Sequence, residues 1–196
     1  VLTAARAIRA GEGELFVAGG VESMSRAPFV LPKAETAFSR NAEIYDTTIG
    51  WRFVNPLLKQ QYGIDSMPET GENVAEVFSI SRADQDAFAL RSQQRAVAAQ
   101  QSGVFNEEII PVPVPGKGGP TLVSVDEHPR ADTSMETLAK LRPVLGGQDP
   151  ESTVTAGNAS GQNDAAAMCI VTHPARAAEL GLRPLVDLDL RLGEGT

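Results

Sequence analysis

Residues 153–172 read TVTAGNASGQNDAAAMCIVT, and this stretch changes character halfway along. Its first half is small and polar, whereas its second half, from Ala165 onward, is an apolar run. Glycine, alanine and serine leave the backbone accessible and its N–H groups able to donate, so such a loop suits a long, thin ligand. The alternative is a tight turn into a core element. The apolar run is expected to be buried, with Cys169 as a small hydrophobic residue rather than a nucleophile.

The composition is typical of a soluble globular protein. The chain has 196 residues, 42% hydrophobic and 21% charged, which is enough for one large or two small domains. The net charge of −8 argues against nucleic acid or an anionic membrane as the main partner. The single cysteine excludes an internal disulfide and indicates a reducing, cytoplasmic setting. We expect no metal site and no bound prosthetic group.

The beginning of the chain has the pattern of a helix followed by a strand. Residues 1–10 carry apolar side chains at helical spacing, and Gly11 ends that pattern. A strand is expected from residue 14, which Gly19 and Gly20 then turn out of the sheet. Arg-bearing and free of acids, residues 1–10 also resemble a transit peptide, but we interpret them as a helix within a longer protein. Such helix-to-strand units indicate an α/β fold.

Further along, Ser81 is expected to cap the longest helix, which runs to about Ser102, with Gly103 as a left-handed cap. An alanine, leucine and valine stripe should face the core, and the glutamines and arginines should face solvent. Other expected elements are a helix at 69–79, an edge strand or extended arm at 109–114, a flexible tip at 115–120, strands at 121–125 and 185–196, and a helix at 174–180.

Several segments resemble the thiolase family, which are acyl-CoA C-acyltransferases: VAGGVESMSRAPFV at 17–30, MPETGENVAE at 67–76, SRADQDAFALRSQQRA at 81–96 and TAGNASGQND at 155–164. The resemblance extends from Val1 to about Leu185. Residues 35–55 are most similar to the degradative thiolases that cleave β-ketoadipyl-CoA. The resemblance implies a partial thiolase-like α/β fold, made of a piece of the N-terminal αβα layered half and the loop domain that projects from it.

The resemblance also implies a division of the chain into three parts. They are part of the N-terminal thiolase half at 1–30, a loop domain that binds coenzyme A at 31–152, and a return to the N-terminal half at 153–196, truncated before the C-terminal half. The catalytic cysteines and histidine of the family are expected outside the chain, with the reactive cysteine roughly two helical turns before Val1. We therefore expect no catalytic residue in this chain, and we do not equate His173-Pro174 with the catalytic motif of the family.

Coenzyme A is the expected ligand, and acyl-CoA the expected substrate. By resemblance, the contact residues are Met67, Arg130, Thr137, Leu141, Ala156 and Ser160, with Leu145 as a further position. An arginine can clamp phosphate with parallel hydrogen bonds, which suits the nucleotide end of coenzyme A. Each residue also has a simpler interpretation: Arg130 as a solvated charge, Met67 as a gap filler, and Leu141 and Leu145 as core residues of a helix begun by Asp132 or Thr133.

Thiolase chemistry is the thiolytic cleavage of a 3-ketoacyl-CoA to acetyl-CoA and a shortened acyl-CoA, or its reverse, in fatty acid or aromatic degradation. The isolated chain is expected to be inactive. The resemblance implies a homodimer or homotetramer, with the turn at 22–26 near an interface, although a surface loop packed by its own aromatics is the alternative. Two other functions stay open: a coenzyme A-binding or dimerising module without catalysis, and an unrelated α/β interaction domain.

Overall fold

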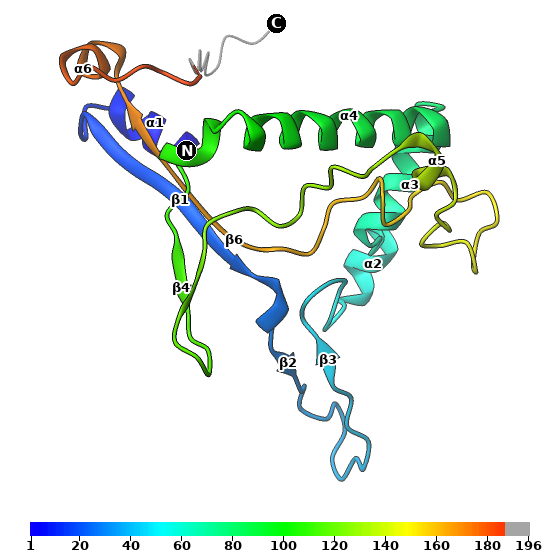
Figure 1. The fold of residues 1–196 in the computed structure, drawn as a ribbon. Coiled ribbons are helices and arrows are strands. Elements are labelled where there is room, and N and C mark those ends of the chain that lie inside the picture. The colour runs from blue at the N-terminus through cyan, green and yellow to red at the C-terminus, as the bar shows by residue number, and fades with distance from the viewer. Residues whose placement is uncertain (187–196) are drawn as a thin grey trace, which may run out of the picture. The chain divides into compact units, whose positions relative to one another are not determined.

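The computed structural model describes residues 1–186, which divide into two units (Figure 1). One unit consists of Val1–Ser23 and residues from 164 onward, and the other is Met24–Asn163. Each contains both helices and strands, so the predicted α/β class is confirmed. The predicted division after residues 30 and 152 into thiolase half and loop domain stays a prediction. Among residues 1–186, no helix has the length and apolar character needed to cross a membrane.

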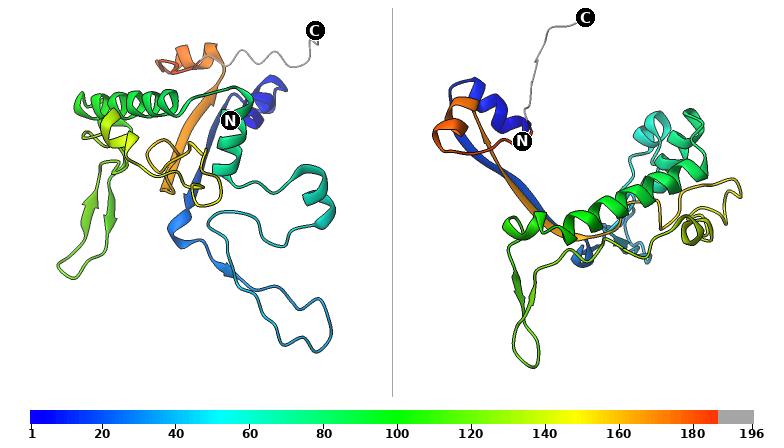
Figure 2. Two further views of the ribbon diagram at one scale, coloured as in Figure 1. Left: turned by 90° about the vertical axis from the view of Figure 1, so that its right-hand side faces the viewer. Right: turned by 45° about the horizontal axis from the view of Figure 1, so that its top comes forward.

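The first unit is built on one antiparallel pair of long strands. Its elements are α1 (Leu2–Arg9), β1 (Leu15–Ser23), β6 (Asp164–Thr172) and α6 (Pro174–Glu179). Leu15 lies opposite Thr172 and Ser23 lies opposite Asp164, so the strands pair along their whole length (Figures 1 and 2). The predicted helices at the start of the chain and after Thr172 are confirmed, with Gly181 in the left-handed conformation at φ 66°.

The expectation that Gly19 and Gly20 turn the chain out of the sheet is wrong. Strand β1 continues through both residues, because β6 satisfies its backbone hydrogen bonds on one edge. Gly19 has a packing role instead: a Cβ atom there would collide with Met168 and with the carbonyl oxygen of Ala167. A Cβ atom on Gly20 would meet nothing within 4 Å. Gly19 therefore permits a close approach between strands, and neither glycine makes a turn.

The prediction that the apolar run from Ala165 onward is buried is also wrong. The side chains of β6 are exposed along most of the strand, Cys169 included, and Met168 keeps 68% of its surface. On the paired strand, Val17 is 70% exposed. Within residues 1–186 the sheet has two strands, and strand side chains become buried only when further layers pack over them. Residues 1–186 supply no such layer at these positions.

The second unit contains the longest helix and two short hairpins (Figure 1). Its elements are η1 (Met24–Arg26), β2 (Phe29–Val30), β3 (Tyr45–Asp46), α2 (Pro56–Tyr62), α3 (Met67–Val77), α4 (Arg82–Gln101), η2 (Val104–Glu107), β4 (Val112–Val114), β5 (Thr121–Val123) and α5 (Met135–Ala139). Strands β4 and β5 pair antiparallel, and Figure 2 shows them as an extended hairpin. The predicted strand at 121–125 and the edge-strand alternative for 109–114 are therefore confirmed, with shorter strands than expected, and the flexibility of the tip stays a prediction.

Side-chain caps define where the helices of this unit begin. Ser66 and Glu69 form a capping box at α3, with the Ser66 N–H donating to Glu69 Oε2 at 2.6 Å. This box starts the helix at Met67, slightly before the predicted start. At α4, Ser81 Oγ accepts from the Asp84 N–H at 3.1 Å, and Gly103 has a φ of 76°, so both predicted ends of this helix are confirmed.

The inward face of α4 differs from the predicted apolar stripe. Asp86 is 2% exposed and Ala89 is 9% exposed, whereas Ala83 and Ala87 lie on the exposed face. Helix α5 is short and capped by Ser134, so Leu141 and Leu145 lie beyond it rather than on a helix begun by residue 132 or 133. The buried residues of this unit are Ala75, Asp86, Ala89, Leu138, Ser152, Val154 and Thr155. The predicted strand at 185–196 extends outside the described residues.

Candidate functional site

The loop at residues 153–161, called the 153–161 loop below, is held by its own side chains. Thr155 is fully buried, and its N–H donates to Asn158 Oδ1 at 2.7 Å. Its hydroxyl oxygen accepts from the Gly157 N–H at 3.2 Å, and its carbonyl accepts from the Ala159 N–H at 3.0 Å. Because side chains replace secondary structure as hydrogen-bond partners, the loop has one well-defined turn.

The loop glycines are required by neighbouring side chains. A Cβ atom on Gly157 would lie 2.5 Å from both Leu138 Cδ2 and Leu141 Cδ1. One on Gly161 would lie 2.5 Å from His128 Cε1. The expectation that these glycines offer bare backbone to a ligand is therefore wrong, since side chains of the protein occupy that space. The neighbouring Ala156 and Ser160 are exposed and remain accessible.

Glu72 on α3 holds the start of the 153–161 loop. Its Oε1 accepts from the N–H groups of Thr153 and Val154, each at 2.7 Å, and its Oε2 accepts from the Thr153 hydroxyl at 2.8 Å. Partial burial alone would raise the pKa of Glu72, but these donors outweigh it and hold the pKa below its usual value of 4.5. The ionised carboxylate thus ties helix α3 to the loop.

Asp86 and Arg82, one turn apart on α4, form a second connection that we call the Arg82–Asp86 pair. Arg82 Nε donates to Asp86 Oδ2 at 2.8 Å, and Arg82 Nη2 donates to the carbonyls of Leu138 at 2.7 Å and Leu141 at 3.1 Å. The other carboxylate oxygen accepts from Asn158 Nδ2 at 3.0 Å. One buried carboxylate therefore connects the C-terminal end of α5 with the 153–161 loop.

Other polar side chains of α4 also bind loops, so the prediction that its glutamines and arginines serve solvation is wrong for Arg82, Gln85 and Gln100. Gln85 Nε2 donates to Thr153 Oγ1 at 2.9 Å, and Gln100 Nε2 donates to the Asp126 carbonyl at 2.8 Å. The sequence analysis missed the roles of Glu72, Arg82 and Asp86. The only local signal was the i, i+4 spacing of Arg82 and Asp86, which also occurs on solvent-exposed helix faces.

The residues predicted to contact coenzyme A, which are Met67, Arg130, Thr137, Leu141, Ala156 and Ser160, are all solvent-exposed. Leu141 and Ala156 come together, because the Leu141 side chain packs at Gly157. Thr137 lies on α5 next to Leu138, which also packs at Gly157, although the Thr137 hydroxyl is engaged in the cap with Ser134. Met67 is 71% exposed at the start of α3, and no described contact joins it to this group. The ligand contacts themselves stay predictions.

Arg130 lies at a shallow pocket of about 170 Å³ between the second half of α4 and residues 130–133. Its backbone N–H donates to Gln93 Oε1 at 2.8 Å, which fixes the position of the main chain. Within residues 1–186 its guanidinium group has neither an ion pair nor a hydrogen bond. A cation in this setting can accept an anionic ligand.

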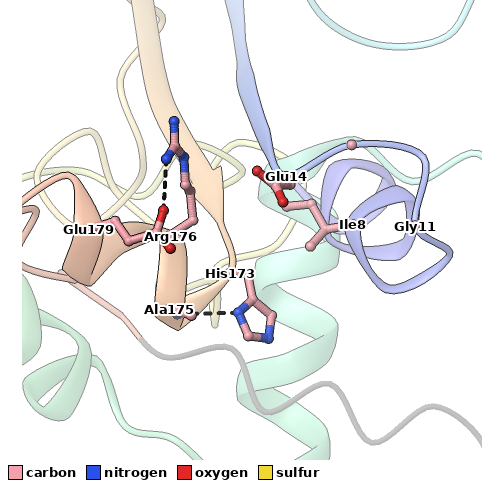
Figure 3. Close-up of a pocket in the computed structure, with 8 residues that line it drawn as sticks. Ile8, Gly11, Glu14, His173, Ala175, Arg176 and Glu179 are labelled. Atoms are coloured by element: carbon pink, nitrogen blue, oxygen red, sulfur yellow. Dashed lines mark hydrogen bonds and ion pairs between the residues drawn. The ribbon is translucent and has the colours of Figure 1, made fainter.

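A pocket of about 360 Å³ in the first unit lies between the α1–β1 turn and α6 (Figure 3). Two of its charged groups bind each other: Arg176 Nη1 donates to Glu179 Oε2 at 2.7 Å, a hydrogen bond that raises the pKa of Arg176. His173 Nδ1 accepts from the Ala175 N–H at 3.2 Å and so caps α6. Within the part of the chain described, no cluster of ligands suited to a metal occurs.

Comparison with known proteins identifies the class. Residues 1–175 match the N-terminal domain of thiolase. The chain therefore belongs to the thiolase family, and its structure is a partial α/β thiolase fold.

The relatives include the β-ketoadipyl-CoA thiolase of Pseudomonas aeruginosa, which is 62% identical over 182 residues, covering 93% of this chain and 45% of that protein. The 3-oxoadipyl-CoA/3-oxo-5,6-dehydrosuberyl-CoA thiolase of Escherichia coli is 59% identical over 182 residues, covering 92% and 45%. The crystal structure of Bacillus anthracis acetyl-CoA acetyltransferase superimposes with a TM-score of 0.74 at 38% identity, covering 93% and 44%. The chain thus spans less than half the length of these proteins.

Proposed function

We propose that this chain supplies coenzyme A-binding elements of a thiolase that cleaves a 3-ketoacyl-CoA to acetyl-CoA and a shortened acyl-CoA. In that reaction the bond between C2 and C3 of the substrate breaks. The acyl carbon C3 ends bonded to the sulfur of coenzyme A, and the thiol proton ends on the methyl group of acetyl-CoA. The family membership and the arrangement of the exposed residues support this proposal.

The observation that carries this proposal is the contrast between exposed contact residues and the residues that hold them in place. We call the latter the frame; it consists of Glu72, Arg82, Asp86, Leu138, Thr155 and Asn158. Leu138 is 3% exposed and Thr155 is fully buried, while Leu141, Ala156 and Ser160 beside them are exposed. A ligand site needs accessible groups that are held rigidly, because a preorganised site loses less conformational entropy on binding. The end of α5 and the 153–161 loop, which lie on this frame, suit the pantetheine arm of coenzyme A, because that arm is long and thin.

Charge supports the same ligand. The chain carries a net charge of −8, so an anion needs local cations to bind. Arg130 is exposed at its pocket, and Lys140 and Arg142 follow at the other end of α5, also exposed. Guanidinium groups bind phosphate oxygens through paired hydrogen bonds, which suits the diphosphate and the 3'-phosphate of coenzyme A.

For the substrate class we propose β-ketoadipyl-CoA, a 3-ketoacyl-CoA with a terminal carboxylate, in the degradation of aromatic compounds. The names of the relatives at 62% and 59% identity support this assignment, whereas the acetyl-CoA acetyltransferase structure is 38% identical. A homodimer or homotetramer, a cytoplasmic location and the absence of a prosthetic group belong to the same proposal.

Calorimetric titration of coenzyme A into the chain tests the site. Arg130→Ala is expected to weaken binding about tenfold or more, because it removes a charge-assisted phosphate contact. The matched control is Arg40→Ala, which removes the same charge from an exposed position outside the pocket. Equal affinities for the two variants would argue against the phosphate role of Arg130.

A second candidate is a coenzyme A-binding module without catalysis. Cys169 lies in the middle of β6, opposite Ala18, and His173 caps α6, so these side chains form no described nucleophile and base pair. We expect residues 1–196 alone to leave acetoacetyl-CoA intact in the presence of coenzyme A, as read from the absorbance of its magnesium enolate. A chain extended to the length of the relatives is expected to cleave it. Binding without cleavage in the extended chain would favour the module.

A further inference from the structure

We infer that Arg82 and Asp86 are positioning residues for coenzyme A binding, although neither belongs to the predicted contact set. The inference rests on the proposed function. It assigns the Arg82–Asp86 pair the task of fixing the distance between the end of α5 and the 153–161 loop. These two segments carry most of the exposed residues expected to contact the ligand, namely Thr137, Leu141, Ala156 and Ser160.

The hydrogen bonds of the pair reach both segments and little else. On one side the Arg82 guanidinium donates to the carbonyls of Leu138 and Leu141, at and just beyond the C-terminal end of α5. On the other side Asp86 binds Asn158, whose Nδ2 also donates to the Thr153 carbonyl at 3.1 Å. A change in either residue of the pair therefore alters both segments.

The packing between the end of α5 and the 153–161 loop leaves no room for an added side-chain atom at Gly157. Leu138 and Leu141 already occupy the space where a Cβ atom of Gly157 would lie, at 2.5 Å. Apolar contact between these leucines and a glycine supplies no direction, so it cannot by itself set the register of the loop. Directional hydrogen bonds from one guanidinium and one carboxylate can set it.

Burial explains why the pair requires both charges. The Asp86 side chain is 2% exposed and that of Arg82 is 25% exposed. A carboxylate at this depth needs a cationic partner and further donors, and the structure supplies Arg82 and Asn158. Lysine at position 82 would keep the charge but has no planar fork able to bind Asp86 and two carbonyls together.

The test compares Arg82→Gln and Asp86→Asn with Arg95→Gln, which makes the same substitution on an exposed position of the same helix. Coenzyme A affinity is measured by calorimetry, and backbone hydrogen exchange is measured at Thr155, Asn158 and Ala159. We expect both variants of the pair to bind coenzyme A about tenfold more weakly, as they would if a tenth of the molecules kept the competent arrangement. Exchange at the loop should become faster, while Arg95→Gln behaves as wild type.

In an extended, active chain the same variants should raise KM for coenzyme A while kcat at saturation is largely kept, since the pair serves binding and not the reacting bond. A general loss of folding would instead lower the apparent kcat, because fewer molecules are active, and would leave KM unchanged. If Arg82→Gln does not fold, Arg82→Lys replaces it with the same expected weakening. Wild-type binding retained by both pair variants overturns the inference alone. Failure of the wild-type chain to bind coenzyme A overturns the proposed function, and the inference with it.

Discussion

Hydrogen bonds are used in opposite ways in two regions of the molecule, the frame that holds the 153–161 loop and the strand pair β1–β6. In the frame, the side chains of Glu72 and Asn158 satisfy loop backbone groups, Asp86 accepts from Asn158 Nδ2, and Thr155 is fully buried. In the strand pair the ladder satisfies the backbone of each strand along the shared edge, but apolar side chains such as Val17 stay 70% exposed. The frame is therefore complete within this chain, whereas the sheet has surfaces that only additional layers can bury.

The largest expected loss of stability comes from removing Asp86 from the frame. Asp86→Ala leaves Arg82 and Asn158 without their shared acceptor in a site where Asp86 was 2% exposed. We expect a loss of about 3 kcal/mol in the free energy of unfolding, measured in urea by circular dichroism. Asp126→Ala, at an exposed loop position, is the control and should change little. An equally small effect for both would show that the frame does not depend on the buried pair.

A smaller effect is expected from Gly157→Ala. The added methyl group would lie 2.5 Å from Leu138 and Leu141, so the loop or the leucines must move. Overpacking of this kind costs about 1–3 kcal/mol, which thermal unfolding can detect. In Gly147→Ala the new Cβ meets nothing within 4 Å, so this variant should be neutral. Identical melting of the two variants would contradict the close packing at Gly157.

Glu72→Gln tests the pH dependence of the frame. Because the pKa of Glu72 is lowered on folding, its contribution is present above the unfolded value of 4.5 and is lost as the pH falls through the folded value. At pH 7 we expect the variant to be about 1–2 kcal/mol less stable than wild type, and the difference should shrink in acid. Glu76→Gln, at an exposed position on the same helix, should show no such dependence. A difference independent of pH would contradict the role of the charge.

The smallest expected effect concerns the strand pair. Cys169 is exposed, so in the isolated chain its alkylation by iodoacetamide should be within about an order of magnitude of the rate in the urea-unfolded chain. Mass spectrometry of the labelled peptide measures both rates. Strong protection in the native chain would mean that the strand is covered, and it would remove the contrast with the frame.

Elements whose signals are local were predicted well. The Ser81 cap, the left-handed Gly103 and the strand at 121–125 depend on neighbours in sequence, and the structure confirms them. The exposed contact residues were placed by resemblance, and their contacts stay predictions. The frame beneath them could not be predicted, because Glu72 meets Thr153 across 81 positions in sequence and Asp86 meets Asn158 across 72.

By itself, the amino-acid sequence determined the family, the class of fold and the ends of the main helices, since motifs, caps and periodicity are short-range properties. Only the tertiary structure decided that Gly157 accommodates Leu138 and Leu141, and that Gly19 continues a strand. It also decided that Asp86 faces inward while Cys169 faces outward. The physical reason is that burial depends on which distant segments pack over a residue, and no local pattern contains that information.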